Sequence, residues 1–355
     1  MMKRVLTLLA VCVIGIGVAG AQDLCTGAEM LMTRDSLPAG RVAVVANQTS
    51  MVGHTHLVDT LLSRGVKVVK IFCPEHGFRG TVEAGIKVQN GVDHRTGLPI
   101  VSLYGNNKKP TPSQMRDVDL VIFDLQDVGC RFYTYISTLH YVMEACAEQG
   151  IPLLVLDRPN PNAGYVDGPV LDTSKLRSFV GMHPVPVVYG MTIGEYARMI
   201  LGEGWVADSC RLEVETMHGY RRDSAYVLPV PPSPNLRTPQ AIALYPSLCF
   251  FEGTTVSVGR GTPWPFEVIG TLPDTMDLRR VAVGDSLTLR YLMAMHRRTP
   301  KGKFFLRSNF FELLSGTTDL RGQLESGMSE AEIRATWQPG LAAFRPIRAR
   351  YLLYP

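Results

Sequence analysis

Six short apolar runs alternate with amphipathic segments over the first two thirds of the chain. The runs are rich in Val, Ile, Leu and Phe and lie at residues 41–51, 68–73, 98–104, 119–127, 151–156 and 212–217. Continuous apolar runs of this length are typical of strands that are buried on both faces of a parallel sheet. Segments with helical spacing lie between several of them, at residues 56–65, 136–149 and 192–204. This alternation predicts an α/β fold whose parallel strands are joined by right-handed crossovers.

The predicted helices carry start and stop signals. Gly65 and Gly150 follow the last apolar position of the first two helices, where a residue without a side chain commonly ends a helix. Thr192 precedes the third helix, and Glu195 stands three positions later. This spacing predicts a capping box, in which the two side chains satisfy each other's backbone N–H groups.

The composition changes at Val227, where the Pro-rich segment VLPVPPSPNLRTP begins. We place a domain boundary there, with an N-terminal domain at residues 22–226 and a smaller domain at residues 227–355. Residues 250–270 are rich in Gly, Thr and aromatic residues and lack a helical period, so they are predicted to form loops and short strands. Helices around residues 287–298 and 329–337 and a terminal strand at 348–354 complete a small α+β domain.

The first 21 residues have the pattern of a secretory signal peptide. Lys3 and Arg4 precede an apolar run that ends in Ala19-Gly20-Ala21, which is an A-x-A cleavage site. We therefore expect an exported protein, periplasmic or secreted.

Cleavage would lower the formal charge from +4 to +2. A nearly neutral chain argues against nucleic acid as a partner, and no later apolar stretch approaches the ~20 residues of a membrane-spanning helix.

The sharpest change from apolar to polar residues lies in the stretch VVKIFCPEHGFRG at residues 68–80. Pro74 ends the strand, because proline lacks an N–H group and restricts the preceding residue. Glu75, His76 and Arg79 follow at once. Ligands of open α/β sheets bind in the crevice beyond the carboxyl ends of the strands. These three side chains are therefore candidates for a site, although a polar surface loop with a Glu–Arg pair has the same pattern.

Other strands of the predicted sheet also end in polar residues, which would meet at the same edge. These are Asn47, Tyr104, Asp124 to Asp127, and Asp157 to Asn160. Arg131, Tyr133 and Tyr135 follow at alternating positions, and such residues suit sugar stacking and carboxylate binding. Packing of this loop onto the next helix is the alternative. The C-terminal part could add Asn235, Glu252, Arg260 and Trp264.

A crevice with several carboxyl groups suits hydrolysis of a glycosidic bond, which needs a protonated acid beside the leaving oxygen. We assign Glu75 as that acid, and we expect it to share a pocket with Asp127 and Arg131. Alternatively, Asp124 or Asp127 is the acid and Glu75 orients the substrate. A metal-dependent hydrolase is a second class, with ligands among Asp124, Asp127, Asp157, His76 and His140, although no HExxH motif is present. A dinucleotide enzyme is disfavoured, because the first turn, ANQTSMVG, lacks G-x-G-x-x-G.

Ordered motifs from Arg41 to the C-terminus resemble one family. They include PEHGFRG (74–80), FDLQDVGCRFYTYISTL (123–139), DRPNP (157–161), PPSPNLRTP (231–239) and FEGTTVSVGRGT (251–262). The chain is similar to the NamZ-type exo-β-N-acetylmuramidases. The resemblance implies a Rossmann-like N-terminal domain, a smaller C-terminal domain and a cleft between them. It also implies release of N-acetylmuramic acid from non-reducing ends of peptidoglycan fragments, without a metal or nucleotide cofactor.

The resemblance also implies roles for single residues. The proposed catalytic Glu of the family's PEHG motif is Glu75 here, with Asp124, Asp127 and Tyr135 as candidates to complete the catalytic pair. The lactyl carboxylate of muramic acid requires a cation, and the candidate arginines are Arg79, Arg131 and Arg260. The remaining candidate substrate ligands are Asn47, His76, Tyr133, Asn160 and Asn235.

The chain departs from the family after Gly270, where relatives carry a longer segment before the next helix. Here TLPDTMDLRRVAVGDS leads almost directly to Leu287. The shortening leaves the N-terminal motifs intact, but it could remove one wall of the cleft. A non-hydrolytic muropeptide-binding protein, or an enzyme with altered substrate range, is therefore an alternative.

Overall fold

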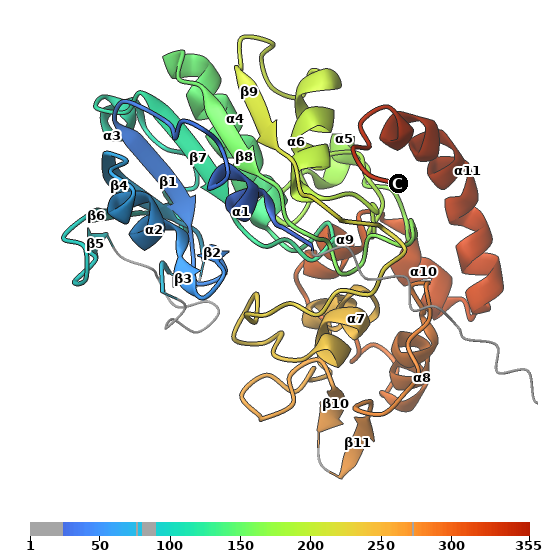
Figure 1. The fold of residues 1–355 in the computed structure, drawn as a ribbon. Helices are drawn as coiled ribbons and strands as arrows, with labels where there is room; N and C mark the ends of the chain where they lie inside the picture. Colours follow the sequence, from blue (N-terminus) through green and yellow to red (C-terminus); the bar gives the residue numbers. More distant parts are fainter. Residues whose placement is uncertain (1–23, 76, 80–89, 272) are drawn as a thin grey trace, which may run out of the picture.

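A seven-stranded sheet forms the centre of the N-terminal part (Figure 1). The computed structural model describes residues 24–75, 77–79, 90–271 and 273–355. In spatial order the strands are β5 (Gly91–Val92), β6 (Pro99–Ser102), β4 (Val68–Cys73), β1 (Val42–Ala46), β7 (Leu120–Asp124), β8 (Leu153–Leu156) and β9 (Leu212–Glu215). All neighbours are parallel except the edge strand β5. In chain order the six parallel strands read 3-2-1-4-5-6, the Rossmann arrangement, so the predicted α/β class is confirmed.

Both faces of this sheet are covered by helices. Val42, Val44 and Ala46 of β1 pack with α1 (Gly27–Leu31) and α2 (Leu57–Ser63). Ala43 and Val45 of the same strand belong to the second buried cluster, with α4 (Tyr135–Gln149) and α6 (Ile193–Gly202). Successive strand residues point to opposite faces, so each strand must be apolar throughout. This explains why the strands appear in the sequence as continuous apolar runs.

The helix signals of the sequence are confirmed. Thr192 Oγ1 accepts a hydrogen bond from Glu195 N at 3.3 Å, and Glu195 Oε2 accepts one from Thr192 N at 2.9 Å, which is the predicted capping box of α6. Gly150 ends α4 in the left-handed conformation, with φ of 63°. Short elements connect the main ones: the hairpin of β2 (Met51–Val52) and β3 (Thr55–His56), and helices α3 (Pro112–Met115) and α5 (Thr173–Leu176).

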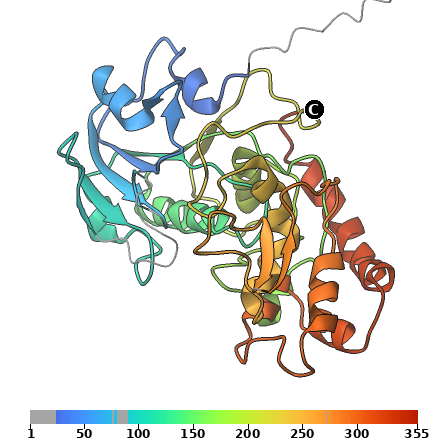
Figure 2. The same cartoon turned by 90° about the horizontal axis from the view of Figure 1, so that it is seen from below.

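Most of the C-terminal elements lie beyond the carboxyl ends of the strands, whereas the last helix runs back alongside α6, where Arg350 pairs with Glu203 at 2.7 Å (Figures 1 and 2). The C-terminal elements are α7 (Pro239–Leu248), the 3-10 helix η1 (Cys249–Gly253), the hairpin β10 (Val268–Thr271) and β11 (Asp274–Asp277), and helices α8 (Arg290–Arg298), α9 (Phe310–Ser315), α10 (Asp319–Glu325) and α11 (Glu330–Ala349). None of the helices in the described ranges is both long and apolar enough to cross a membrane.

The predicted terminal strand at residues 348–354 is wrong. Helix α11 continues to Ala349, past Pro339 and Pro346, because Ile333, Trp337 and Leu341 form a buried stripe at helical spacing. The chain beyond it is irregular. Tyr354 anchors this tail to the N-terminal part, since its hydroxyl donates to Asp157 Oδ2 at 2.7 Å.

A buried arginine connects the two parts of the molecule. The Arg131 side chain is fully buried. Its Nη1 donates to the carbonyl oxygens of Pro169 and Val185, both at 2.8 Å. Its Nη2 donates to those of Leu314 and Ser315 at 2.9 and 2.8 Å. Burial lowers the pKa of Arg131 to about 9, so the group is charged at neutral pH. The last two carbonyls end helix α9, where the helix dipole is negative and favours a cation.

We expect Arg131→Leu to lower the free energy of unfolding by about 3–5 kcal/mol, because four carbonyl groups would lose a charged donor in a buried site. Urea denaturation followed by circular dichroism measures the change. Arg307→Leu is the matched control, since Arg307 is exposed, and it should stay within about 0.5 kcal/mol of the wild type. Equal stability of the two variants would contradict a connecting role for Arg131.

Candidate active site

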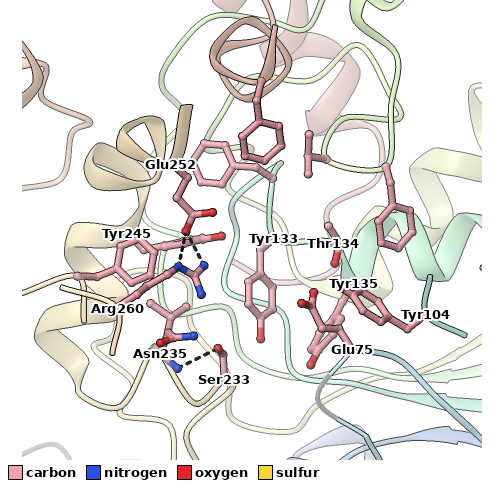
Figure 3. Close-up of a pocket in the computed structure, with 16 residues that line it drawn as sticks. Glu75, Tyr104, Tyr133, Thr134, Tyr135, Ser233, Asn235, Tyr245, Glu252 and Arg260 are labelled. Atoms are coloured by element: carbon pink, nitrogen blue, oxygen red, sulfur yellow. Dashed lines mark hydrogen bonds and ion pairs between the residues drawn. The ribbon is translucent and has the colours of Figure 1, made fainter. Parts of the chain in front are cut away.

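A pocket of about 410 Å³ lies where the carboxyl ends of the strands meet the C-terminal part (Figure 3). Glu75 follows β4, Tyr104 follows β6, and residues 132–135 follow β7. From the C-terminal part come Ser233, Asn235, Glu252 and Arg260. The volume is in the range of small-molecule sites, and the lining runs from Glu75 to Phe310, so it combines distant segments of the chain.

Aromatic rings form much of the pocket wall. They belong to Tyr104, Phe132, Tyr133, Tyr135, Phe179, Tyr245, Phe266 and Phe310. Several of them pack edge to face: the ring centroids of Tyr133 and Tyr135 are 4.8 Å apart, and those of Phe132 and Tyr245 are 5.3 Å apart. Such contacts fix ring positions. The pocket therefore offers rigid apolar surfaces with phenol groups at their edges, which suits a ligand such as a sugar.

Glu75 is half-buried and lies on the sheet side of the pocket, beside Tyr104 and Tyr135 (Figure 3). Burial, the charge of Glu75 and a hydrogen bond to it raise the pKa of Tyr104 to about 12. The Tyr104 phenol is therefore a neutral hydrogen-bond donor to this carboxyl group over the whole physiological pH range.

Tyr133 and Tyr135 line the pocket as predicted, and both hydroxyl groups have protein partners. Tyr135 Oη accepts a hydrogen bond from Asn47 Nδ2 at 2.8 Å. Asn47 is fully buried and does not line the pocket, so it positions Tyr135 from behind. Tyr133 Oη donates to the carbonyl of Pro232 at 2.8 Å and so ties the loop after β7 to the C-terminal part.

Glu252 and Arg260 form an ion pair on the opposite wall (Figure 3). Arg260 Nε and Nη2 both donate to Glu252 Oε1, at 3.1 and 2.5 Å. Partial burial disfavours the guanidinium charge, but the carboxylate of Glu252 outweighs it and raises the pKa of Arg260. Asn235 lies beside this pair. Trp264 does not line the pocket; the guanidinium of Arg279 lies 4.7 Å from the centre of its ring.

Asp127 and Arg131 do not line the pocket with Glu75, so the expectation that they share it is wrong, and Asp124 does not line it either. Asp124 is fully buried and pairs with Arg158 through two hydrogen bonds of 2.5 and 2.8 Å. Asp127 Oδ2 accepts hydrogen bonds from Gly129 N, at 2.7 Å, and from the Tyr189 hydroxyl. Burial raises the pKa of Asp127 to about 6. Both carboxyl groups hold the polypeptide behind the pocket.

Three other predicted substrate ligands, Arg131, Arg79 and Asn160, do not line this pocket. Both terminal nitrogens of Arg131 donate to the four carbonyl groups described above, and its side chain is fully buried and does not line the pocket, which removes it from the candidate substrate ligands. Arg79 pairs with Asp93 at 2.9 and 2.7 Å and lines a separate cavity. Asn160 is buried and donates to the carbonyl of Met191 at 2.8 Å. His76 lies outside the described residues.

The ligands considered for a metal site also have structural partners. Asp157 accepts hydrogen bonds from the Thr192 hydroxyl and from Gly194 N, at 2.7 and 2.8 Å. The rings of His140 and His183 are joined by an Nδ1···Nε2 contact of 3.0 Å. Over the described ranges, no three His, Cys, Asp or Glu side chains are grouped so that they could hold a metal ion.

Comparison with protein families supports the motif resemblance. The model of the N-terminal domain of exo-β-N-acetylmuramidase NamZ matches residues 42–240, and that of the C-terminal domain matches residues 243–284 and 279–354. The chain belongs to the NamZ family. The two C-terminal matches meet at residues 279–284, within the segment that the sequence predicts to be shortened.

Single proteins to which the chain is similar agree with this assignment. The chain is 34% identical over 380 residues to the peptidoglycan β-N-acetylmuramidase NamZ of Bacillus subtilis (strain 168), covering 93% of this chain and 91% of the relative. Crystal structures of two DUF1343 family proteins from Bacteroides fragilis NCTC 9343 superpose with TM-scores of 0.82 and 0.81, at 40% and 29% identity. Each comparison covers 94% of this chain and 99% of the other.

Proposed function

We propose that this protein is an exo-acting glycoside hydrolase that releases N-acetylmuramic acid from the non-reducing ends of peptidoglycan fragments. Membership of the NamZ family supports the reaction class. The observation that carries the proposal is the position of Glu75, the carboxyl group of the PEHG motif, in an aromatic pocket at the carboxyl end of β4.

In this mechanism Glu75 is the general acid. It transfers its proton to the glycosidic oxygen as the bond to the anomeric carbon breaks, which prevents a charged leaving group. The Tyr104 phenol then donates to the newly formed carboxylate. Glycosidases use a second carboxylate on the other side of the sugar ring, and Glu252 lies on the opposite wall (Figure 3). We assign Glu252 to that role: it either removes a proton from the water that attacks the anomeric carbon, or first bonds to that carbon and is then displaced by water. In both cases water supplies the hydroxyl group of the released sugar.

Arg260 is the candidate for recognition of the lactyl carboxylate. Of the three arginines expected from the sequence, Arg260 lines this pocket, whereas Arg79 and Arg131 do not. Its pair with Glu252 uses Nε and Nη2 and leaves Nη1 for a ligand. A guanidinium group held by a carboxylate is pre-organised for a second carboxylate. The lactyl group distinguishes muramic acid from glucosamine, so Arg260 would set this preference.

The first test is release of N-acetylmuramic acid from the disaccharide MurNAc-GlcNAc. We expect Glu75→Gln to lower kcat/KM at least about 1,000-fold, because the amide cannot donate the proton. Glu325→Gln, an exposed glutamate, should retain full activity. A folded wild type that binds the disaccharide without cleaving it would refute hydrolysis. It would favour the muropeptide-binding alternative, which the shortening predicted from the sequence after Gly270 also motivates.

The second test compares MurNAc-GlcNAc with the GlcNAc-GlcNAc disaccharide. We expect Arg260→Gln to lower kcat/KM on MurNAc-GlcNAc by about tenfold to a hundredfold, the size expected for loss of a charge-assisted hydrogen bond. The variant should lose most of the preference between the two substrates, whereas Arg307→Gln should keep it. Equal losses on both substrates would mean that Arg260 acts through Glu252 and does not recognise the lactyl group.

We also infer that the protein is exported. The support is the sequence alone: Lys3 and Arg4, the apolar run that follows them, and the A-x-A site that ends at Ala21. We expect the chain purified from the periplasm or medium of its host to begin at Gln22. Mass spectrometry of the intact protein tests this, and a chain recovered from the cytoplasm with its first 21 residues would contradict export.

A further inference from the structure

A second cavity of about 430 Å³ adjoins the active-site pocket. Asn235 and Arg260 line both cavities, so the two spaces meet at these side chains. The rest of the second cavity is formed by Pro234, Arg237 and residues 261–263. All of this lining comes from two loops of the C-terminal part, whereas Glu75 comes from the sheet side.

Both loops are held by internal hydrogen bonds. In the first, Leu236 N donates to the carbonyl of Ser233 at 3.0 Å, and Asn235 N donates to Ser233 Oγ at 3.1 Å. In the second, Thr262 donates to the carbonyl of Gly259 through its backbone N and its Oγ1, at 3.1 and 2.6 Å. These turns shape the cavity before any ligand arrives, which lowers the entropy cost of binding.

The second cavity is cationic. Its described lining contains two arginines and no acidic residue. Arg237 is exposed, and its Nε donates to the carbonyl of Pro234 at 2.5 Å. This bond orients the guanidinium group and leaves both terminal nitrogens for a ligand. In the part of the chain that the structure describes, no carboxylate forms an ion pair with Arg237, in contrast to Arg260 with Glu252.

We propose that this second cavity binds the leaving side of the glycan chain and that Arg237 pairs with the lactyl carboxylate of the next muramic acid. This inference rests on the proposed function. An exo-acting enzyme holds the terminal sugar in the first pocket, so the rest of the chain must extend through an adjoining space. Peptidoglycan alternates neutral N-acetylglucosamine with muramic acid. A cationic cavity beside the site of cleavage therefore selects peptide-free chains that contain a second muramic acid.

The test compares a peptide-free tetrasaccharide, MurNAc-GlcNAc-MurNAc-GlcNAc, with the disaccharide MurNAc-GlcNAc. The wild type should show a higher kcat/KM on the tetrasaccharide, and Arg237→Gln should lower the tetrasaccharide-to-disaccharide ratio about fivefold, as expected for a partly exposed ion pair. Arg307→Gln should leave the ratio unchanged. Sodium chloride at 1 M should reduce the ratio in the wild type and have little effect on it in Arg237→Gln, because salt screens this pair. An unchanged ratio in Arg237→Gln would overturn the inference.

Calorimetry with the Glu75→Gln variant separates this inference from the proposed function. The variant should bind the tetrasaccharide more tightly than the disaccharide, and the added Arg237→Gln change should remove most of that difference. If the wild type cleaves neither substrate but this binding preference exists and depends on Arg237, the second cavity is supported and hydrolysis is refuted. If cleavage occurs but the preference survives without Arg237, hydrolysis is supported and the role of Arg237 is refuted.

Discussion

The buried guanidinium of Arg131 is the interaction on which the site depends most. Its four carbonyl acceptors come from two loops of the N-terminal part and from the end of α9 in the C-terminal part. Arg131 directly precedes residues 132–135 of the pocket wall. Close to the guanidinium lies Gly316, with φ of 76°, where a side-chain carbon would lie 2.4 Å from Arg131 Nη2. The buried cation thus holds together the loop after β7 and the two parts that form the pocket.

The Rossmann strand order is combined here with a first turn that differs from that of dinucleotide-binding proteins. In dinucleotide-binding proteins, backbone N–H groups of the turn after the first strand face a phosphate. Here side chains of the same turn occupy those donors: Asn47 Oδ1 accepts from Thr49 N at 2.9 Å, and Ser50 Oγ accepts from Asn47 N at 3.0 Å. The pocket of this protein lies instead at the loops after β4, β6 and β7, and residues of the C-terminal part form its opposite wall. Glu75 and Glu252 therefore face one pocket from opposite walls.

The acidic residues at the strand ends have mainly architectural partners. Asp124 pairs with Arg158, Asp127 binds the turn at Gly129, and Asp157 accepts hydrogen bonds from Thr192 and from the C-terminal tail. The same edge of a parallel sheet attracts both ligands and loop-fixing carboxylates, because the N–H groups of turns and helix starts at this edge need acceptors, as Gly129 N and Gly194 N do here. Polar residues at strand ends therefore indicate where a site lies, but they do not identify the carboxyl group that performs the chemistry.

The sequence by itself determined the α/β class, the order of the main strands and helices of the N-terminal part, the capping box of α6 and the motif that contains Glu75, because these depend on local periodicity and on neighbouring residues. Only the tertiary structure decided which polar side chains share a pocket. It brought Tyr104, Glu252 and Arg260 together with Glu75 and turned Arg131 and Asp127 away from it. The physical reason is that burial and hydrogen bonding are shared among segments far apart in the chain. Whether a charged side chain has a structural role or can bind a ligand depends on which distant residues pack against it.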